Sequence, residues 1–307
     1  MSEPFEFIII GGGPAGLTAA IYAANAMLKS LLIEREVPGG QMNLAALIEN
    51  FPGFPEGISG FELGQRMHQQ AVKFGLNSVN AEVKSVLLED GMLKVKTSGG
   101  DFSSHTILVA SGAKHQKLGI PGEDKLLGKG VSYCAVCDGA LFRNKPVAVI
   151  GGGNSAVNES LYLSHFVSHI YLIHRRDSLR ASALLQQRVL SNPKIKAIWN
   201  TVVEEIAGDD RVKELRLRNS KTGQTSALEV SAAFVAIGSI PNTDFIRGVV
   251  TLDEAGSVLT NDMLETSVPG IFAAGDVRRN SPRQAIVAAG EGAYAALQAD
   301  ALRHRRD

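Results

Sequence analysis

The chain has 307 residues, of which 45% are hydrophobic, and this is enough for about two domains with ordinary apolar cores. Lysine plus arginine and aspartate plus glutamate balance at 31 each, which excludes a broad field of either sign for holding nucleic acid or an anionic membrane. No apolar run reaches the ~18 residues that span a bilayer, and residues 1–6 lack the features of a secretion signal, so we expect a soluble, cytoplasmic protein.

The chain begins with a predicted strand, a glycine turn, a helix and a second strand. Residues 5–10 are apolar apart from Glu6, as is typical of a buried strand, and run directly into Gly11-Gly12-Gly13-Pro14-Ala15-Gly16. Residues 17–27 are rich in alanine and predict a helix, and residues 30–33 predict the second strand, which ends in Glu34. In this setting a G-x-G-x-x-G sequence indicates a dinucleotide site.

The same order of elements returns 140 residues later. The second copy consists of a strand at 146–150, the turn Gly151-Gly152-Gly153-Asn154-Ser155-Ala156, a helix at 157–164 and a strand at 168–173. Each copy is followed by alternating strands and one more apolar strand, ending near residues 112 and 238. This self-similarity predicts two copies of one nucleotide-binding domain.

A third strand at residues 270–274 ends at Gly275-Asp276 and leads to an alanine-rich helix near 283–302. It belongs to neither copy in sequence order, so we expect the second domain to be inserted into the first. The predicted fold is α/β, with two Rossmann-like, three-layer ββα domains. The expected boundaries are 1–117 and 244–307 for the first domain and 118–243 for the second, with crossovers at the Gly- and Pro-containing segments 118–122 and 238–242.

Each glycine of such a turn has its own task. The first permits the tight bend, the second lets the backbone approach a pyrophosphate, and the third position allows close packing of helix and strand. The helix N-terminus then holds the anion. These positions are Gly11, Gly13 and Gly16 in the first copy and Gly151, Gly153 and Ala156 in the second. A lone motif also occurs for steric reasons alone, whereas two copies between strand and helix favour binding.

The residue that ends the second strand indicates which nucleotide each copy takes. Glu34 can accept hydrogen bonds from both ribose hydroxyls, which suits FAD or NAD, and an exposed strand end is the alternative. The second copy has His174-Arg175-Arg176 there, with Arg180 one turn further on. The guanidinium groups of arginine can bind the 2′-phosphate of NADPH through paired hydrogen bonds. The alternative is a solvent-exposed basic surface. We expect His174 to pack or cap rather than to catalyse.

The only cysteines are Cys134 and Cys137, whose C-x-x-C spacing is typical of reversible redox chemistry or of half a zinc site. The seven histidines offer no second ligand cluster, so we expect no metal. In a redox pair one thiolate attacks a disulfide and the other resolves the mixed disulfide. Asp138 is the candidate proton carrier, with an ordinary Asp-Gly turn as the alternative.

At these residues the chain closely resembles the low-molecular-weight, bacterial-type thioredoxin reductases, over nearly its whole length. The most specific part is C-x-x-C-D-G at residues 134–139, shortly before the second glycine turn, together with H-R-R-x-x-x-R at 174–180 after it. The other matching segments are Gly11 to Gly16, Gly39-Gly40-Gln41, Glu49-Asn50-Phe51-Pro52-Gly53, Gly151 to Ala156, Gly275-Asp276 and Arg283-Gln284-Ala285.

The resemblance implies an enzyme, a homodimeric NADPH-dependent thioredoxin-disulfide reductase. Electrons would pass from NADPH through FAD to Cys134 and Cys137 and on to thioredoxin or a thioredoxin-like protein. Cys137 would lie against the flavin, and Cys134 would exchange with thioredoxin. The implied FAD residues are Gly11, Gly13, Pro14, Ala15, Gly16, Glu34, Gly40, Gln41, Asn50, Gly112, Asp276, Arg283, Gln284 and Ala285. The implied NADPH residues are Gly151, Gly153, Asn154, Ser155, Ala156, Glu159 (near the nicotinamide), His174, Arg175, Arg176 and Arg180.

The chain departs from the family at one place. Two large aromatic residues often follow C-x-x-C-D-G and help to dock thioredoxin, whereas this chain has Ala140 and Leu141 before Phe142. Three alternatives stay open: a ferredoxin-driven reductase of the same fold, a dithiol oxidase, and a non-enzymatic redox-sensing module. The ferredoxin-driven reductase and the dithiol oxidase would usually lack the arginine cluster. The redox-sensing module would show no turnover with NADPH.

Overall fold

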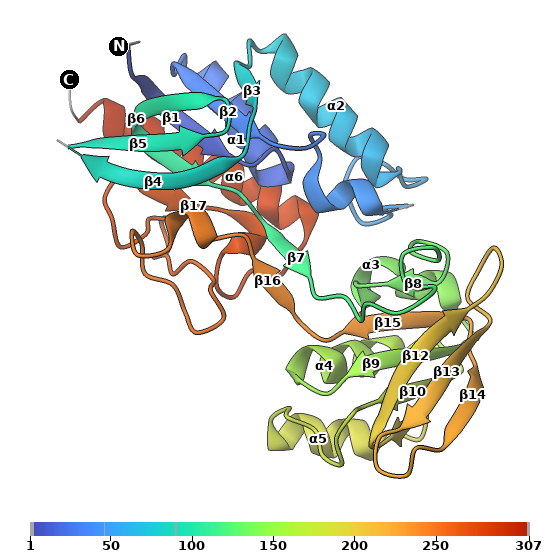
Figure 1. Ribbon diagram of the computed structural model, residues 1–307. Helices are drawn as coiled ribbons and strands as arrows, with labels where there is room; N and C mark the ends of the chain where they lie inside the picture. Colours follow the sequence, from blue (N-terminus) through green and yellow to red (C-terminus); the bar gives the residue numbers. More distant parts are fainter. Residues whose placement is uncertain (1–2, 46, 90, 306–307) are drawn as a thin grey trace. The chain divides into compact units, whose positions relative to one another are not determined.

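The computed structural model describes residues 3–45, 47–89 and 91–305. They form two compact units (Figure 1). Unit 1 contains the described residues up to 114 and from 240 onward, and unit 2 contains residues 115–239. Unit 2 is therefore an insertion in unit 1. None of the helices in the described ranges has the length and apolar character needed to cross a bilayer.

The sheet of unit 1 joins a parallel layer to an antiparallel hairpin. Its strand order is β3 (Ser78–Asn80), β2 (Ser30–Glu34), β1 (Phe5–Ile10), β6 (Gly100–Val109), β5 (Met92–Thr97) and β4 (Val83–Glu89), and β17 (Ile271–Ala273) also pairs with β6. Strand β6 makes the junction, because its first half pairs antiparallel with β5 and its second half pairs parallel with β1 and β17.

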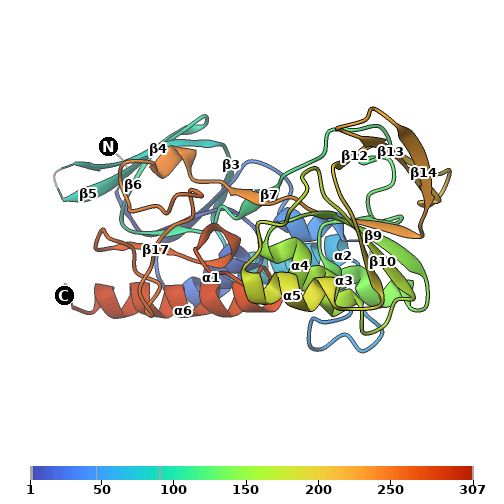
Figure 2. The same ribbon diagram turned by 90° about the horizontal axis from the view of Figure 1, so that it is seen from below.

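Helices cover one face of the parallel layer, and the antiparallel hairpin of β4 and β5 covers the other face (Figure 2). The helices are α1 (Pro14–Asn25), α2 (Gly60–Lys73) and α6 (Ala285–Arg303), with short 3₁₀ turns η1 (Gly40–Leu44), η3 (Asp244–Ile246) and η4 (Gly275–Val277). Alternate residues of β1 enter different cores: Phe7 and Ile9 pack toward the helices, and Ile8 and Ile10 pack toward the hairpin. The part of the strand that is buried on both faces, residues 7–10, is apolar throughout.

Unit 2 repeats the same three layers. Its parallel sheet has the order β11 (Ile195–Ile198), β10 (His169–Ile173), β9 (Pro146–Gly151), β15 (Ala232–Ala236) and β8 (Val131–Ser132). Its helices are α3 (Ala135–Asp138), η2 (Gly139–Phe142), α4 (Asn154–Leu163) and α5 (Ala183–Leu190), and the antiparallel layer is β12 (Thr201–Ala207), β13 (Glu214–Asn219) and β14 (Thr225–Glu229). The predicted α/β fold of two three-layer domains, one inserted into the other, is confirmed.

The chain passes between the units through two paired strands, β7 (Ala113–His115) and β16 (Ser239–Pro241). We predicted the first crossover at residues 118–122, and the structure places that segment within unit 2. There the carboxylate of Glu123 accepts hydrogen bonds from the amides of Leu118 and Gly119 at 2.9 and 2.8 Å. The glycines and proline interrupt regular structure at this point without marking the boundary.

Both helices that follow the glycine turns begin earlier than the sequence predicted. Helix α1 begins at Pro14 and α4 at Asn154, where we expected residues 17 and 157. Proline suits the first helical position, since its missing N–H would have no partner there. The free amides of each first helical turn therefore lie inside the glycine motif itself.

Helix α2 was not predicted, although the sequence carries a signal for it. The hydroxyl of Ser59 accepts a hydrogen bond from the amide of Glu62 at 3.1 Å, which is the pattern of a capping box. Leu63, Met67 and Ala71 then recur at helical spacing and are buried. The many polar residues between them hid this periodicity.

The packing of α6 on α1 makes a prediction about two glycines of one helix. A Cβ on Gly292 would lie 2.0 Å from the carbonyl oxygen of Ala15, so Gly292→Ala should lower the free energy of unfolding by about 1–3 kcal/mol. Gly290 is the matched control, because no described atom lies within 4 Å of its Cβ position, and Gly290→Ala should raise it by up to about 1 kcal/mol. Urea titrations of both variants test this, and equal effects would contradict the packing argument.

Candidate active site

The turn between β1 and α1 brings backbone segments together at glycines that have no room for a side chain. A Cβ on Gly11 would lie 2.4 Å from the carbonyl oxygen of Ala110, just after β6. A Cβ on Gly16 would lie 1.8 Å from the carbonyl oxygen of Gly11. At Gly13, in contrast, no described atom beyond the glycine and its chain neighbours lies within 4 Å of the same position. The turn is closed toward the sheet and open where the motif places a pyrophosphate.

The turn between β9 and α4 has the same geometry in unit 2. A Cβ on Gly151 would lie 2.3 Å from the carbonyl oxygen of Ala236, at the end of β15. Gly153 repeats the open position, again with no described atom within 4 Å. Both turns therefore leave room for an anion at the second motif glycine.

The middle glycine of each turn touches the residue that ends the second strand. A Cβ on Gly12 would lie 3.1 Å from the side chain of Glu34, and one on Gly152 would lie 2.3 Å from the ring of His174. Glu34 also accepts hydrogen bonds from the amides of Gly12 at 2.5 Å and Glu36 at 2.8 Å. These amides fix its carboxylate beside the turn and leave further lone pairs for an outside donor.

The carbonyl of the middle glycine holds the loop that follows. In unit 1 the carbonyl of Gly12 accepts from the amide of Gly39 at 2.8 Å, and in unit 2 the carbonyl of Gly152 accepts from the amide of Arg180 at 2.7 Å. Arg180 thus takes the place in unit 2 that Gly39 has in unit 1. This bond attaches the arginine cluster directly to the second glycine turn.

The cluster surrounds a buried histidine. The His174 side chain is 5% exposed, and burial lowers its pKa. The positive charges of three exposed arginines lower the pKa of His174 further: Arg180, Arg176 and Arg175. The neighbouring acid, Asp177, pairs with Lys221 at 2.9 Å. An arrangement of cations next to a glycine turn suits a phosphate group.

The two cysteines form a disulfide at the start of α3, with Cα atoms 5.3 Å apart. The amide of Cys137 donates a hydrogen bond to Sγ of Cys134 at 3.1 Å. Both side chains are partly exposed. An N–H that points at a sulfur favours the thiolate there once the bond is reduced. Among the described residues, no group of three or more His, Cys, Asp and Glu side chains could hold a metal ion.

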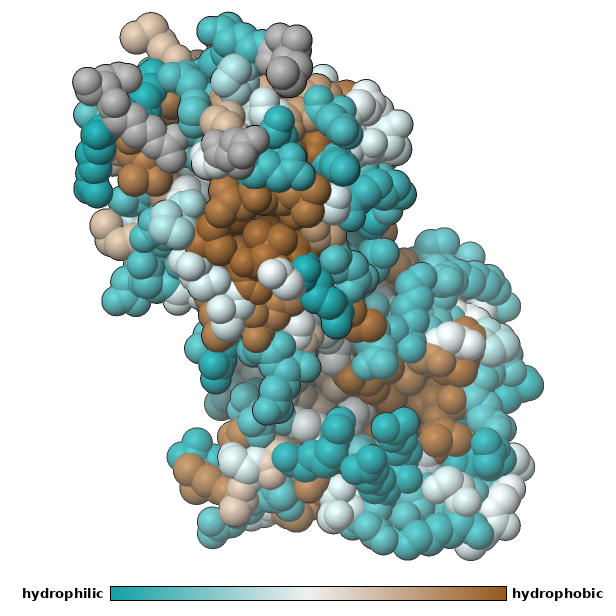
Figure 3. Space-filling view, turned by 60° about the vertical axis from the view of Figure 1, so that its left-hand side comes forward, coloured by the Kyte–Doolittle hydropathy of each residue, from teal (hydrophilic) through white to brown (hydrophobic). Residues whose placement is uncertain are grey.

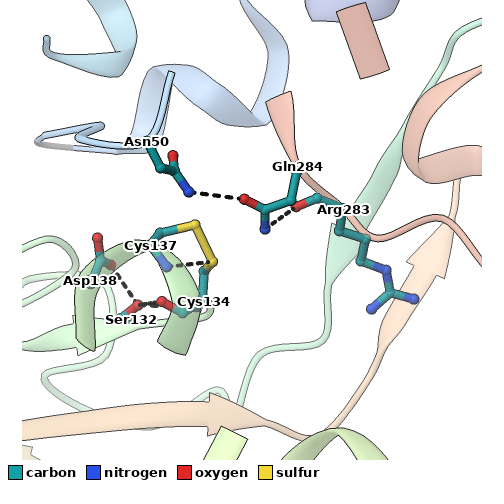
Figure 4. The surroundings of a disulfide bond; sticks show 7 residues. All are labelled: Asn50, Ser132, Cys134, Cys137, Asp138, Arg283 and Gln284. Atoms are coloured by element: carbon teal, nitrogen blue, oxygen red, sulfur yellow. Dashed lines mark hydrogen bonds between the residues drawn. A yellow bond between two sulfur atoms is a disulfide. The ribbon is translucent and has the colours of Figure 1, made fainter. Parts of the chain in front are cut away.

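Sequence reasoning missed Ser132, which links Asp138 to the disulfide segment (Figure 4). Its hydroxyl donates to Oδ2 of Asp138 at 2.6 Å and accepts from the amide of Cys134 at 3.0 Å. Ser132 is 3% exposed, so the carboxylate is oriented by a buried group. A serine two residues before the first cysteine is a short-range signal that could have been used, because such side chains often bond nearby backbone.

The turn at Gly275 and Asp276 is fixed by a second pair that the sequence did not reveal. Glu291 in α6 accepts from the amide of Gly275 at 2.7 Å and pairs with Arg278. Burial raises the pKa of Asp276, and the positive charge of Arg283 opposes that rise. The predicted residues Asp276 and Arg283 are therefore close enough to interact.

Two further contacts in unit 1 join residues that the sequence singled out for the cofactor. Nδ2 of Asn50 donates to Oε1 of Gln284 at 3.1 Å, although the two residues are 234 positions apart in the chain (Figure 4). A Cβ on Gly40 would lie 3.2 Å from the Cα of Gly13, so Gly40 packs on the open part of the glycine turn. Residues from both ends of the chain thus meet in one region.

The other predicted residues lie on the same elements. In unit 1 they are Pro14 and Ala15 in the first turn of α1, Gln41 in η1, Gly112, whose carbonyl accepts from the amide of Asn242 at 3.0 Å, and Ala285 at the start of α6. In unit 2 they are Asn154, Ser155 and Ala156 at the start of α4, with Glu159 half-buried one turn further along. Their roles in binding stay predictions.

Two dinucleotide-type turns and a redox disulfide in one chain define a class, the disulfide oxidoreductases built on nucleotide-binding folds. The family model "Pyridine nucleotide-disulphide oxidoreductase" matches residues 5–292. The thioredoxin reductase of Treponema pallidum is 45% identical over 96% of both chains, and that of Bacillus subtilis is 44% identical over 96% of this chain and 94% of its own. A solved thioredoxin reductase from Streptococcus pyogenes matches with a TM-score of 0.94, 41% identity and 98% coverage of both chains.

The chain therefore belongs to the pyridine nucleotide-disulphide oxidoreductases, in their thioredoxin reductase branch. The resemblance found in the sequence is confirmed.

The burial of His174 predicts a pH dependence of stability. The ordinary pKa of histidine, 6.5, applies to the unfolded chain, and the folded value is lower. The unfolded state therefore binds more protons below this pH, so the free energy of unfolding should fall as the pH drops below about 6.5. His174→Gln should flatten this slope. Urea unfolding of unit 2, followed by fluorescence of the single tryptophan, Trp199, tests it, and an unchanged slope in the variant would contradict the assignment.

Proposed function

We propose that the chain is an NADPH-dependent, FAD-containing thioredoxin reductase. The observation that carries the proposal is the Cys134–Cys137 disulfide, with Asp138 beside it, in a unit whose glycine turn is bonded to an arginine cluster. Identity of 45% over 96% of the chain to the thioredoxin reductase of Treponema pallidum supports thioredoxin as the partner.

Unit 1 is the proposed FAD domain. The open position at Gly13 fits a pyrophosphate, and the Glu34 carboxylate fits the ribose hydroxyls of an adenosine without a 2′-phosphate. Asp276, Asn50 and Gln284 would hold the remaining parts of the flavin. When bound, FAD would accept a hydride equivalent from NADPH and supply two electrons to the disulfide.

Unit 2 is the proposed NADPH domain. The open position at Gly153 fits its pyrophosphate, and the exposed guanidinium groups fit the 2′-phosphate. Burial keeps His174 neutral, so its ring would pack beside the turn without adding charge. Glu159, in the second turn of α4, is the proposed neighbour of the nicotinamide.

Disulfide exchange would follow from the geometry of the cysteine pair. Two electrons break the Cys134–Cys137 bond, and proton uptake completes the dithiol. The Cys134 thiolate, which the Cys137 amide stabilises, attacks the partner disulfide, forming a mixed disulfide and releasing a partner thiolate. The Cys137 thiolate then attacks Sγ of Cys134, which reforms the S–S bond and frees the reduced partner. Asp138 is the proposed carrier of the proton, held in place by Ser132.

The proposed docking surface lies around this pair. Val136 and Leu141 are 47% and 48% exposed, so an apolar partner surface can cover them. Small Ala140 stands where the family often has an aromatic residue, which reduces the area available for contact.

We also propose a homodimer in the cytoplasm. The support for the dimer is the family resemblance together with an apolar patch on the surface (Figure 3). Independently of that view, the exposed apolar residues of unit 1 include Tyr22, Phe61, Ile286 and Leu297. An exposed apolar face of this kind suits an interface with a second copy.

A ferredoxin-driven reductase and a dithiol oxidase are disfavoured by Arg175, Arg176 and Arg180, for which neither has a use. A redox-sensing module is disfavoured by the two open glycine turns, which a binding switch does not need.

Removal of either thiol tests the relay. NADPH oxidation in the presence of thioredoxin should be lost in Cys134→Ser and in Cys137→Ser, since each variant lacks the disulfide that accepts the electrons. Wild type without thioredoxin is the control for direct loss of electrons to oxygen. Normal thioredoxin reduction by either variant would reject the disulfide as carrier.

The arginine cluster makes a separate prediction about nucleotide choice. The double variant Arg176→Ala/Arg180→Ala should raise the KM for NADPH by about tenfold or more, because charge-assisted hydrogen bonds to the 2′-phosphate are lost. The KM for NADH should change little. Arg188→Ala removes an exposed arginine of the same unit outside the cluster and should leave both values unchanged. A parallel rise for NADPH and NADH in the double variant would point to misfolding of the turn instead.

A further inference from the structure

Directly after β7 the chain enters unit 2 beside a buried carboxylate. Glu123 is 2% exposed, and its oxygens accept from the amides of Leu118 and Gly119 at 2.9 and 2.8 Å. A buried charge is stable only where donors surround it. Glu123 therefore fixes the segment that directly follows β7, where the chain has just left unit 1.

Tyr133 connects this carboxylate to the disulfide. Its hydroxyl donates to Oε1 of Glu123 at 2.8 Å, and its ring stacks on His115 with centroids 4.8 Å apart and planes at 12°. Burial, followed by the bond to Glu123, raises the pKa of Tyr133, so the phenol remains a neutral donor. Tyr133 immediately precedes Cys134. One side chain thus touches the last residue of β7 and the buried acid, and its backbone leads directly into the redox pair.

The unit 1 end of the ribbon is fixed separately. The carbonyl of Gly112 accepts from the amide of Asn242 at 3.0 Å, and the hydroxyl of Ser111 donates to the carbonyl of Asn242 at 2.7 Å. The side chain of Asn242 donates back to the carbonyl of Ser111 at 2.8 Å. On the unit 2 side, the amide of Gln116 donates to the carbonyl of Gly238 at 3.0 Å. Because both ends of the ribbon are held by hydrogen bonds, a change of backbone angles between the units would fall on β7 and β16.

We propose that Glu123 and Tyr133 are positioning residues. They tie the segment at and after the end of β7, residues 115–119, to the disulfide segment, so that the redox pair moves with residues 115–119 as one rigid body. This inference rests on the proposed function, in which nucleotide and disulfide need the flavin in turn. Reorientation of unit 2 is then confined to the ribbon of β7 and β16.

The test compares Tyr133→Phe with wild type in two measurements. Phenylalanine keeps the ring that stacks on His115 and removes only the hydrogen bond to Glu123. In rapid mixing with NADPH without oxygen, the initial bleaching of flavin absorbance should be unchanged. Its recovery, as electrons reach the disulfide, should slow by about tenfold, the factor that corresponds to one lost hydrogen bond to a charged acceptor.

Hydrogen exchange provides a readout that needs no turnover. The amides of Leu118 and Gly119 should exchange faster in Tyr133→Phe, because their acceptor has lost its third donor. The double variant Tyr133→Phe/Glu123→Gln should slow recovery no further than the more affected single variant, since Tyr133 acts through its hydrogen bond to Glu123.

Thr201→Val is the matched control. It removes another hydroxyl of unit 2, one that donates to the carbonyl of Trp199 at 2.7 Å, and should leave the recovery phase unchanged even if the protein is less stable. A recovery phase in Tyr133→Phe equal to that of wild type, or slowed equally in Thr201→Val, overturns the inference. Absence of bleaching or recovery in wild type would instead reject the proposed function.

Discussion

Close approach of backbone to backbone at two glycine turns determines where both candidate nucleotide sites lie. At Gly11 and Gly151 a side chain would strike the carbonyl at the end of a neighbouring parallel strand. Because the backbone occupies that space, the first turn of the following helix lies close to the sheet, and its free amides lie inside the motif. The same constraint brings Glu34 and His174 against their turns. The positions of both candidate nucleotide sites therefore depend on glycines that have no room for a Cβ.

The chemistry of the disulfide depends on groups that lie close in sequence but act through the fold. The hydrogen bond from the Cys137 amide distinguishes the two sulfurs, because it favours negative charge on Cys134. Ser132 orients Asp138 from a buried position. Tyr133 and Glu123 link the same segment to the crossover. The segment from Ser132 to Asp138 thus combines the redox pair, the proposed proton carrier and the link to Glu123.

The sequence predicted the parts of this structure that local pattern encodes. Spacing and residue type determine the apolar strands, the two glycine turns and the inserted second domain, so these could be predicted. The same holds for the difference between the two copies, with Glu34 in the first and the arginine cluster in the second. Buried polar partners could not be predicted. Glu291 meets Gly275, and Glu123 meets Tyr133, through packing that no periodicity reveals. The predicted crossover segment 238–242 contains β16, whereas the first connection, β7, lies just before the predicted segment 118–122. At 118–122 glycine and proline mark irregular backbone inside unit 2.

In the proposed relay, electrons from NADPH arrive at one specific sulfur pair. Anaerobic treatment with NADPH, followed by alkylation and mass spectrometry, measures this directly. We expect Cys134 and Cys137 to resist alkylation in the oxidised protein and to be both alkylated after about one equivalent of NADPH, since one hydride carries the two electrons that open one disulfide. Consumption of NADPH with both cysteines still protected would rule out this relay.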